Sequence, residues 1–539
     1  MSDYEVRPRG MTPKEMPTIW VDYATGQGVT REGTRITPKL GERRKTPNLT
    51  DLLDTAASYG ATRIMLTGRI PEPAPGSRHW LIVKTPNWNG GDVWTSATSP
   101  SGRFTHVSTG QEVQVRTVRE WFGDVPLNPA QARLAWETLE SVIVGVDDRA
   151  RLMLSPARTG ANLWAWSLPK TVPLVPVSAD VADELHMTSG QHHLEHLVAG
   201  PSFATHEYCV PLIDPAVTKK ISAFAHVDGR FMYAALGREL GVGPGIRYNR
   251  AQAYELLTSD PYARARYEVR FTVPSDWAHV GILPVRHENV SDGWYYPNRP
   301  GAVGVTWADA SEVAVALRAG WGIDPLQAVV FNKARPLDTF MDRMNRARER
   351  VLENPDMPPL LKRAVSDALR SILIQAIGNF ASRGRTKVRT ATSAFEIPPQ
   401  YQASAERRGD VFTYRVPSER RPDNGLYHPE VAVQLWGRGR ARVLSAPTAH
   451  DKFGGGALAV PGHTLVGING DALYTTELPE WSMPVEHGGA DDGKTGRLRL
   501  KSFIRGSFLT PASLDARTAL RARADKAGPR AAWTPEADS

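Results

Sequence analysis

The chain has 539 residues, of which 41% are hydrophobic, so it is too long for one core and we expect roughly two to four domains. Its formal net charge is +8 and its pI is about 9.4, which fits a polyanionic partner without proving one. Cys209 is the only cysteine, which excludes an internal disulfide and a cysteine metal cluster and fits a reducing cytoplasm. We expect neither a signal peptide nor a membrane span, because no uninterrupted apolar stretch approaches about 18 residues.

The first two hundred residues predict mixed α/β structure. Strand patterns lie at residues 19–21, 63–66 and 79–83. Helical spacing lies at residues 52–59, 128–144 and 161–166. The termini, residues 1–15 and 521–539, are polar and charged and are expected to be flexible tails, although residues 514–527 could instead form a short basic helix.

A second unit is expected to begin near residue 205. Its predicted strands are residues 224–227, 267–273, 280–283 and 329–331, with hairpins at 293–306 and at 464–475 around the turn dipeptide Asn469-Gly470. Its predicted helices are residues 231–240, 312–320, 339–353, 360–379 and 429–446. The polar, turn-rich residues 383–426 predict a loop or a β-insertion.

Three residues far apart in the chain offer the chemistry of a phosphoryl-transfer site. Asp228 ends a strand-like run, Arg370 lies on a helix, and Asp471 follows the hairpin turn. Two carboxylates can hold divalent cations, and a guanidinium can bind a triphosphate. Taken alone, each has a simpler interpretation: a helix N-cap for Asp228, a turn residue for Asp471 and a solvated side chain for Arg370.

Other candidate residues also have two interpretations. Tyr233 is either a core aromatic or a platform under an incoming sugar, where its ring would clash with a 2′-hydroxyl. Arg348, Arg438 and Arg440 either contact phosphates or lie on solvated helix faces. Residues 192–196 (HHLEH) match the inverted zincin pattern, but nearby glycines weaken the helix and no third zinc ligand is evident.

In combination, these segments resemble family B DNA polymerases, most closely the protein-primed type of phages and linear plasmids. The family's first palm motif, D-x-x-S-L-Y-P, is similar to residues 228–234 (DGRFMYA). Its fingers motif, a Lys followed by N-S-x-Y-G, is similar to Arg370 with residues 374–378 (IQAIG), and residues 378–382 (GNFAS) look like the protein-primed version. Its third motif, D-T-D-S, aligns with residues 469–472 (NGDA).

The sequence between these motifs resembles the family as well. Residues 295–337 are similar to the stretch before the fingers, and residues 428–440 are similar to the helix that leads to the third motif. The resemblance covers about residues 200–510. The fold class it implies is a multidomain α/β (α+β) protein, a right-hand polymerase with palm, fingers and thumb, preceded by a ribonuclease H-like exonuclease-type domain. The implied ranges are 16–200 for the exonuclease-like domain, 201–335 for the palm, 336–382 for the fingers, 383–480 for insertion and palm, and 481–520 for the thumb.

The resemblance also implies functional residues. Asp228 and Asp471 would be catalytic and would bind two Mg²⁺ ions, with Mn²⁺ as an alternative. The implied nucleotide-binding residues are Arg370, Arg348, Tyr233, Gly229, Arg230, Phe231 and Gly378. The implied DNA-binding residues are Arg438, Arg440, Lys494, Arg497 and Lys501. The partners would be a DNA primer-template, dNTPs and a terminal protein primer, and the protein would be a cytoplasmic monomer of a bacterial or phage-infected cell, with no membrane partner.

The chain departs from the family pattern at several positions. The fingers helix has Arg370, Ile374 and Ile377 in place of Lys, Asn and Tyr, and the third motif keeps one of its two acids. The first exonuclease motif, D-x-E, is matched by Asp22 with Ala24 where the Glu belongs. We therefore expect a DNA-directed DNA polymerase that lacks 3′–5′ proofreading.

Two other classes of function remain open from the sequence. One is a catalytically silent DNA-binding factor on a polymerase scaffold, such as a replication or telomere accessory. The other is a primer-making or untemplated nucleotidyltransferase, which the altered fingers motif would suit. A metalloprotease based on residues 192–196 is a more distant alternative.

Overall fold

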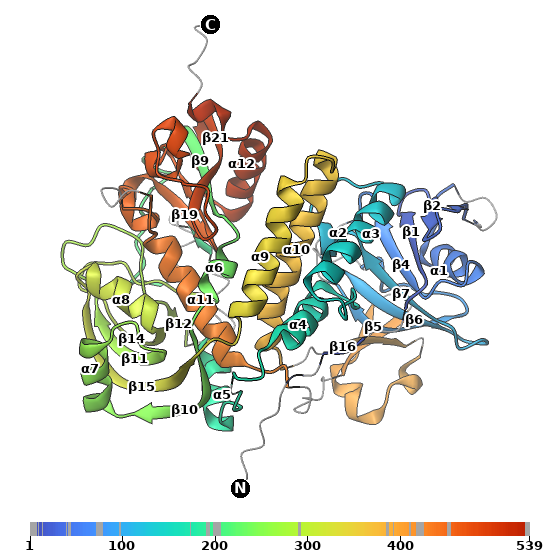
Figure 1. Ribbon diagram of the computed structural model, residues 1–539, viewed down its shortest axis with the longest axis horizontal. Coiled ribbons are helices and arrows are strands. Elements are labelled where there is room, and N and C mark those ends of the chain that lie inside the picture. The colour runs from blue at the N-terminus through green and yellow to red at the C-terminus, as the bar shows by residue number, and fades with distance from the viewer. Residues whose placement is uncertain are drawn as a thin grey trace, which may run out of the picture. The chain divides into compact units, whose positions relative to one another are not determined.

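The computed structural model describes residues 8, 10–12, 15–38, 40, 45–71, 79–95, 99–172, 174–189, 195–197, 206–288, 293–383, 387–391, 393–408, 411–416, 425–449 and 454–533. The chain forms two compact units, each made of separate stretches of sequence (Figure 1). Unit 1 contains Pro169–Met341 and His428–Ser539, and unit 2 contains Arg7–Leu168 and Asp342–Tyr427. The structure thus divides the chain at residue 168 rather than at the predicted residue 200, and it joins residues 342–427 to the N-terminal part.

Unit 2 is built on a ten-stranded mixed sheet in the order β17-β18-β16-β5-β6-β7-β4-β1-β2-β3. Strand β1 is parallel to β4 and antiparallel to β2, and β4 is parallel to β7. The bounds are β1 Thr18–Asp22, β2 Gly28–Thr30, β3 Arg35–Ile36, β4 Arg63–Thr67, β5 Trp88–Trp94, β6 Ser101–His106, β7 Glu112–Thr117, β16 Lys387–Ala391, β17 Glu406–Arg408 and β18 Val411–Val416. The predicted loop or β-insertion is therefore a β-insertion, and β16 pairs with β5 to extend this sheet.

Helices cover both faces of this sheet because side chains alternate along its central strands. Ile19 and Val21 of β1 share a core with helix α1 (Leu49–Ser58), whereas Trp20 between them packs edge-on against Trp136 of α3 (Pro129–Val146). The other helices of unit 2 are α2 Arg119–Phe122, α4 Pro156–Ser167, α10 Pro359–Phe380 and most of α9 Asp338–Glu353, which begins in unit 1. Helix α10 packs along α4 (Figure 1).

The described residues of unit 1 form three antiparallel sheets. Their orders are β21-β9-β20-β19-β8, β10-β15-β11-β14 and the two-stranded β12-β13. The bounds are β8 Glu195–Leu197, β9 Lys220–Gly229, β10 Leu240–Tyr248, β11 Ala265–Thr272, β12 Val285–Arg286, β13 Trp294–Tyr295, β14 Val303–Asp309, β15 Gly322–Ala334, β19 Leu465–Asn469, β20 Ala472–Thr475 and β21 Leu498–Leu509. Its helices are α5 Ala179–Thr188, α6 Met232–Leu236, α7 Arg250–Ser259, α8 Ala310–Arg318, α11 Pro429–Leu444 and α12 Leu514–Ala527.

The C-terminal part of unit 1 differs from its predicted division into thumb and tail. Strand β21, placed in the thumb range, is the edge strand of the five-stranded sheet and pairs with β9. Residues 521–527 belong to helix α12, so the basic helix that we considered for residues 514–527 is confirmed. Ala524 of this helix is fully buried in a cluster with Phe224 and Tyr474 of the sheet.

Most of the predicted helices and the β19–β20 hairpin are confirmed, with boundaries shifted by a few residues. The strand predicted at residues 79–83 is wrong, because His79 accepts hydrogen bonds from the backbone of Leu81 and Ile82 and closes a turn there. The helix predicted at residues 231–240 is wrong after Leu236, where β10 begins at Leu240. The strand predicted at residues 280–283 is irregular, and β13 and β14 pair with other strands rather than as a hairpin.

No helix in the described part of the chain combines the length and the apolar character that a membrane crossing requires.

Candidate active site

The five-stranded sheet of unit 1 brings Asp228 and Asp471 together. Asp228 lies near the end of β9, where it pairs with Ala472 of β20. Asp471 precedes Ala472 in the turn, and its carbonyl oxygen accepts a hydrogen bond of 3.0 Å from the backbone N–H of Gly229. A Cβ atom added at Gly229 would lie 2.8 Å from Oδ2 of Asp471. The two acids are therefore neighbours, one in β9 and one in the turn before β20, and residue 229 must be glycine for the Asp471 carboxylate to occupy its position.

Lys501 lies beside Asp228. Its Nζ is 3.4 Å from Oδ2 of Asp228, whose residue is 5% exposed. The pairing of β21 with β9 shifts between Leu500 and Ser502, so that Lys501 is the extra residue of a bulge. A bulge redirects a side chain relative to the regular alternation of a strand. This local irregularity directs the ammonium group of Lys501 to the carboxylate of Asp228.

The donor set of this site suits a hard divalent cation. Mg²⁺ is usually bound through one or two carboxylates, with the remaining ligands supplied by water and substrate phosphates. Asp228 and Asp471 match that pattern, and among the described residues no cluster of three or more His, Cys, Asp or Glu side chains gathers as a metal site. The residues present therefore fit magnesium held jointly by the protein and a phosphate-bearing substrate.

Arg230 and the segment before β21 form an ion-pair cluster next to the acids. The Arg230 guanidinium donates to Asp491 over 2.6 Å, and Asp491 is buried. Arg497 binds Asp492 through two hydrogen bonds of 3.0 and 3.1 Å, and Lys494 lies 3.1 Å from the same carboxylate. The hydrogen bond from Arg497 holds the pKa of Asp492 well below its usual range. The sequence interpretation missed both acids, which fix three of the predicted nucleotide- and DNA-binding cations in place.

The residues after Arg230 combine backbone strain with a close contact. Phe231 has a φ of +47°, in the left-handed region that a bulky residue rarely adopts, and it precedes helix α6. Such strain is often found at functional sites. The ring of Tyr233 lies against Gly439 of α11, where an added Cβ would be 3.2 Å from Cε1 of Tyr233. The predicted sugar platform thus packs on the backbone of α11.

Arg440 is buried in unit 1 rather than solvated. Its residue is 8% exposed, and its guanidinium binds the fully buried carboxylate of Glu312 through hydrogen bonds of 2.7 and 2.6 Å. Glu312 also accepts a hydrogen bond from the backbone of Asp309 and completes the capping box of α8. This pair joins α11 to α8, which speaks against a role for Arg440 at a DNA backbone.

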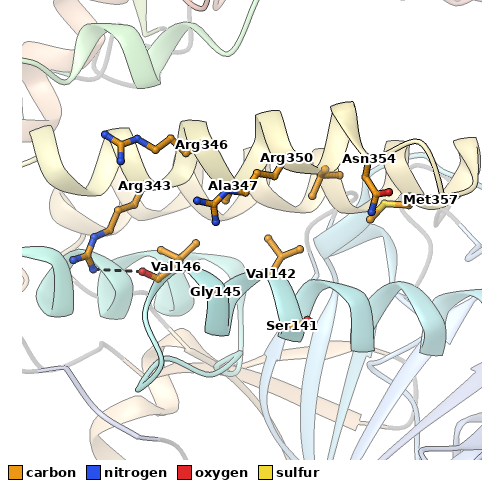
Figure 2. Close-up of a pocket in the computed structure, with 11 residues that line it drawn as sticks. Ser141, Val142, Gly145, Val146, Arg343, Arg346, Ala347, Arg350, Asn354 and Met357 are labelled. Carbon is orange, nitrogen blue, oxygen red and sulfur yellow. Dashed lines mark hydrogen bonds between the residues drawn. The ribbon is translucent and has the colours of Figure 1, made fainter.

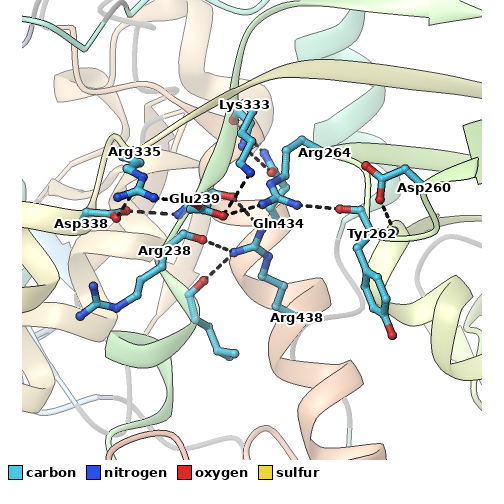
Figure 3. A network of polar contacts seen from close by, with 12 residues as sticks. Arg238, Glu239, Asp260, Tyr262, Arg264, Lys333, Arg335, Asp338, Gln434 and Arg438 are labelled. Atoms are coloured by element: carbon cyan, nitrogen blue, oxygen red, sulfur yellow. Dashed lines mark hydrogen bonds and ion pairs between the residues drawn. The ribbon is translucent and has the colours of Figure 1, made fainter.

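Arg438 also forms its hydrogen bonds within unit 1, in the polar network shown in Figure 3. Its guanidinium donates hydrogen bonds of 2.6 to 3.0 Å to backbone carbonyls, those of Leu236, Arg238 and Glu239. Burial lowers the pKa of Arg438 from its usual value. The Arg438 side chain therefore holds the turn between α6 and β10 to α11, and we do not include it in a proposed DNA-binding surface.

The carboxylate of Glu239 is the acidic centre of that network (Figure 3). It lies 2.6 Å from Arg335, 3.3 Å from Lys333 and 3.4 Å from Arg264. The hydrogen bond from Arg335, followed by that from Lys333, lowers the pKa of Glu239. With a φ of +49°, Glu239 adopts a left-handed turn that brings its carboxylate among these three cations.

The remaining nucleotide-binding candidates lie in unit 2. Arg348 is on α9, and Arg370 and Gly378 are on α10. Both arginines are partly buried. An added Cβ at Gly378 would meet no atom within 4 Å, so packing does not require glycine there. Asp228 and Asp471 therefore lie in unit 1, whereas Arg348, Arg370 and Gly378 lie in unit 2.

The surroundings of Asp22 resemble a turn more than a catalytic centre. Its Oδ1 accepts hydrogen bonds from the backbone N–H groups of Ala24 and Thr25 and from the Thr25 hydroxyl, over 3.0 to 3.1 Å. These contacts close the turn between β1 and β2. Residues 195–197 of the zincin-like segment form strand β8 rather than the helix that this pattern requires, and residues 192–194 lie outside the described residues.

Helix α12 is fixed to the site-bearing strand by a buried contact two residues before Asp228. Nδ1 of His226 lies 2.8 Å from Oδ1 of Asp525, and the Ser502 hydroxyl donates to the same oxygen over 2.8 Å. Burial opposes ionisation of Asp525, but the hydrogen bonds from His226 and Ser502 outweigh it and lower the pKa of Asp525 to about 2.

We predict that Asp525→Asn destabilises the protein by roughly 2 kcal/mol at neutral pH. Because the pKa of Asp525 is lower in the folded chain than its ordinary value near 3.8, the stabilisation is present above about pH 4 and is lost as the pH falls towards 2. Urea denaturation at pH 7 and at pH 2.5 measures this. A variant that is destabilised equally at both pH values would contradict the assignment.

Comparison with solved structures identifies the fold. Two structures of phi29 DNA polymerase with primer-template DNA, a ternary complex with incoming nucleotide and a post-translocation binary complex, superpose with TM-scores of 0.52 and 0.53 at 10% and 11% sequence identity. They cover 92% and 91% of this chain and 85% of the phi29 chain. An orthorhombic crystal form of phi29 DNA polymerase gives 0.52 at 10% identity.

This chain shares its fold with phi29 DNA polymerase. The multidomain α/β fold expected from the sequence is therefore confirmed, over nine tenths of the chain. Neither the protein-family models nor the curated proteins give a match to the sequence. The similarity to phi29 DNA polymerase is therefore one of fold, and only the residues of this chain can indicate its chemistry.

Proposed function

We propose that this protein is a DNA-directed DNA polymerase that transfers nucleotides from dNTPs to a primer hydroxyl or a protein hydroxyl. The observation that carries the proposal is the pairing of Asp228 with the Asp471 turn across β9 and β20, in a chain with the phi29 polymerase fold. Two of the phi29 structures contain primer-template DNA, and one of these also contains incoming nucleotide, which supports the same partners here.

In this proposal Asp228 and Asp471 would hold two Mg²⁺ ions. When bound, such ions lower the pKa of the attacking hydroxyl and stabilise the leaving pyrophosphate. Lys501 neutralises Asp228 in the structure, and we expect it to contact phosphate of the DNA once a cation shares that carboxylate. Arg370 and Arg348 of unit 2 would bind the triphosphate, where bidentate guanidinium contacts are favourable.

The test of the proposal is extension of a labelled primer on a defined template with dNTPs and magnesium. Products that end at the template length support templated synthesis. A wild-type protein that binds the primer-template without extending it would favour the accessory role. Products whose sequence ignores the template would favour an untemplated transferase. Whether a terminal protein serves as primer is tested by offering a serine-bearing candidate protein in place of the DNA primer.

We predict that Gly439→Ala weakens discrimination against ribonucleotides by about five- to ten-fold, on the order of 1 kcal/mol. The added methyl would lie 3.2 to 3.6 Å from three atoms of the Tyr233 side chain, two of its ring and the hydroxyl oxygen, and would displace the ring. The measurement is the ratio of kcat/KM for dNTP and rNTP incorporation. Gly145→Ala is the matched control, because its methyl enters open space on α3.

The Tyr233→Ala variant distinguishes two explanations if Gly439→Ala leaves the discrimination ratio unchanged. If it changes the discrimination ratio and Gly439→Ala does not, Gly439 does not position the ring. If neither variant changes the ratio, Tyr233 is not the residue that senses the 2′-hydroxyl.

We also propose that the exonuclease-like part lacks proofreading activity. Ala24 replaces the expected acid, and the Asp22 carboxylate accepts hydrogen bonds from Ala24 and Thr25 within its own turn. We expect purified protein with magnesium to leave a 5′-labelled single-stranded oligonucleotide intact over hours, while a proofreading polymerase in parallel shortens it. Degradation that Asp22→Ala abolishes would overturn this prediction.

A further inference from the structure

A groove in unit 2 is lined by none of the residues of the proposed active site, although Arg348 lies on the same helix as part of its lining. It is a hollow of about 420 Å³ between α3 and α9 (Figure 2). Helix α3 lines it with Ser141, Val142, Gly145 and Val146, and α9 lines it with Arg343, Arg346, Ala347, Arg350, Val351 and Asn354, with Met357 at one end. These positions recur every three or four residues, so each helix presents one continuous face.

The floor of the groove is apolar. Figure 2 shows Val142 and Val146 pointing from α3 toward α9, where Ala347 lies. Val351 of α9 also lines the groove. Gly145 between the two valines leaves open space, since an added Cβ would meet no atom within 4 Å. The floor therefore offers a recess for an apolar side chain.

The rim of the groove is cationic. Arg343 is already engaged, because it donates to the carbonyl of Val146 and lies 3.2 Å from the Asp147 carboxylate. Arg346 and Arg350 are exposed, and none of the described carboxylates forms an ion pair with either of them. No acidic residue lines the groove. The structure thus places two available guanidinium groups beside an apolar recess.

We propose that this groove binds a partner protein through an acidic amphipathic helix. Arg346 and Arg350 are four residues apart on α9, which corresponds to about 6 Å along the helix axis. Glutamates four residues apart on a partner helix have the same spacing and would meet them as paired ions. The apolar face of the same helix would fill the recess over Val142 and Val146, as amphipathic helices do in apolar grooves.

The lining favours a protein over single-stranded nucleic acid. Sites for single-stranded nucleic acid combine cations with aromatic side chains on which bases stack. The groove has no aromatic residue, and its aliphatic floor offers no stacking surface. The inference does not depend on polymerase activity, and its test uses no primer extension.

The test is selection of a displayed library of helical 18-residue peptides on the full-length protein. We expect enriched peptides with acidic residues four apart and leucine-like residues on the neighbouring face. A synthetic peptide with that consensus is then labelled and titrated by fluorescence anisotropy. Its Kd should increase at least ten-fold for Arg346→Glu/Arg350→Glu, and also for Gly145→Leu, which fills the recess without changing charge.

The matched control is Arg103→Glu/Arg158→Glu, which reverses a partly exposed and an exposed arginine of unit 2 outside the groove and should leave the Kd within two-fold. Thermal melts establish that all variants fold. Enriched peptides that bind the groove variants as tightly as wild type would overturn the proposal, as would a selection without an acidic consensus. Weaker binding of a labelled dT20 oligonucleotide to the groove variants, with peptide binding unchanged, would assign the groove to nucleic acid instead.

Discussion

Asp228→Asn and Asp471→Asn should each reduce the rate of primer extension by at least about a thousand-fold, which corresponds to roughly 4 kcal/mol of transition-state stabilisation. Asparagine keeps the size of the side chain but removes the negative charge that holds a divalent cation. Asp228 lies in β9 and Asp471 immediately precedes the adjacent strand β20, so each loss should affect the same proposed cation-binding centre. Steady-state extension of a labelled primer with magnesium measures both effects.

Folding and DNA binding must be measured alongside the rate. Asp228→Asn removes an ion pair with Lys501, whose side chain is 38% exposed, and the expected change in stability is within about 1 kcal/mol. A matched control is Asp324→Asn, a partly exposed acid of β15 that pairs with Arg250 and should leave extension within two-fold. Extension by both the Asp228→Asn and the Asp471→Asn variant at the wild-type rate would contradict the proposed catalytic role of these acids.

The acids could be predicted from the sequence because their setting is local. Asn469-Gly470 is strong turn chemistry, and the strands on either side of it pair as expected, with Asn469 opposite Ala472. Asp228 follows a hydrophobic run that forms the buried strand β9. The local pattern could not predict that Lys501 contacts Asp228, because this contact requires a bulge in β21.

The cations were less predictable than the acids. An arginine on a helix is commonly solvated, and nothing in the local sequence of α11 marks Arg440 as buried. Its partner Glu312 lies 128 residues away on α8. Likewise, we expected a flexible tail at residues 521–539 because nothing in the local sequence indicates that Asp525 contacts His226, which is 299 residues away. Such long-range pairings depend on the tertiary fold, and a periodic pattern carries no information about them.

Arg440→Met should destabilise unit 1 by about 3–5 kcal/mol, because it leaves the fully buried carboxylate of Glu312 without its cation. Methionine is similar in length to the aliphatic part of arginine, so the loss of packing is small compared with the loss of the ion pair. Chemical denaturation followed by tryptophan fluorescence measures the effect.

A double-mutant cycle with Glu312→Gln separates the pair from its surroundings. Glutamine can still accept the hydrogen bond from the backbone of Asp309 and keep the cap of α8, so Glu312→Gln/Arg440→Met should recover most of the lost stability. The control is Arg250→Met, which removes an ion pair to Asp324 with a 65% exposed arginine and should cost less than about 1 kcal/mol. Equal costs for the two arginines would contradict the buried-pair interpretation.

The same cycle connects this ion pair to the proposed active site. Arg440 follows Gly439, on which the Tyr233 ring packs, so the ion pair to Glu312 fixes the part of α11 that supports this ring. Arg440→Met, measured at a temperature where it remains folded, should therefore also weaken discrimination against ribonucleotides, and Glu312→Gln should restore it. Loss of stability without any change in discrimination would show that α11 keeps its position by packing alone, and that the pair contributes only to folding.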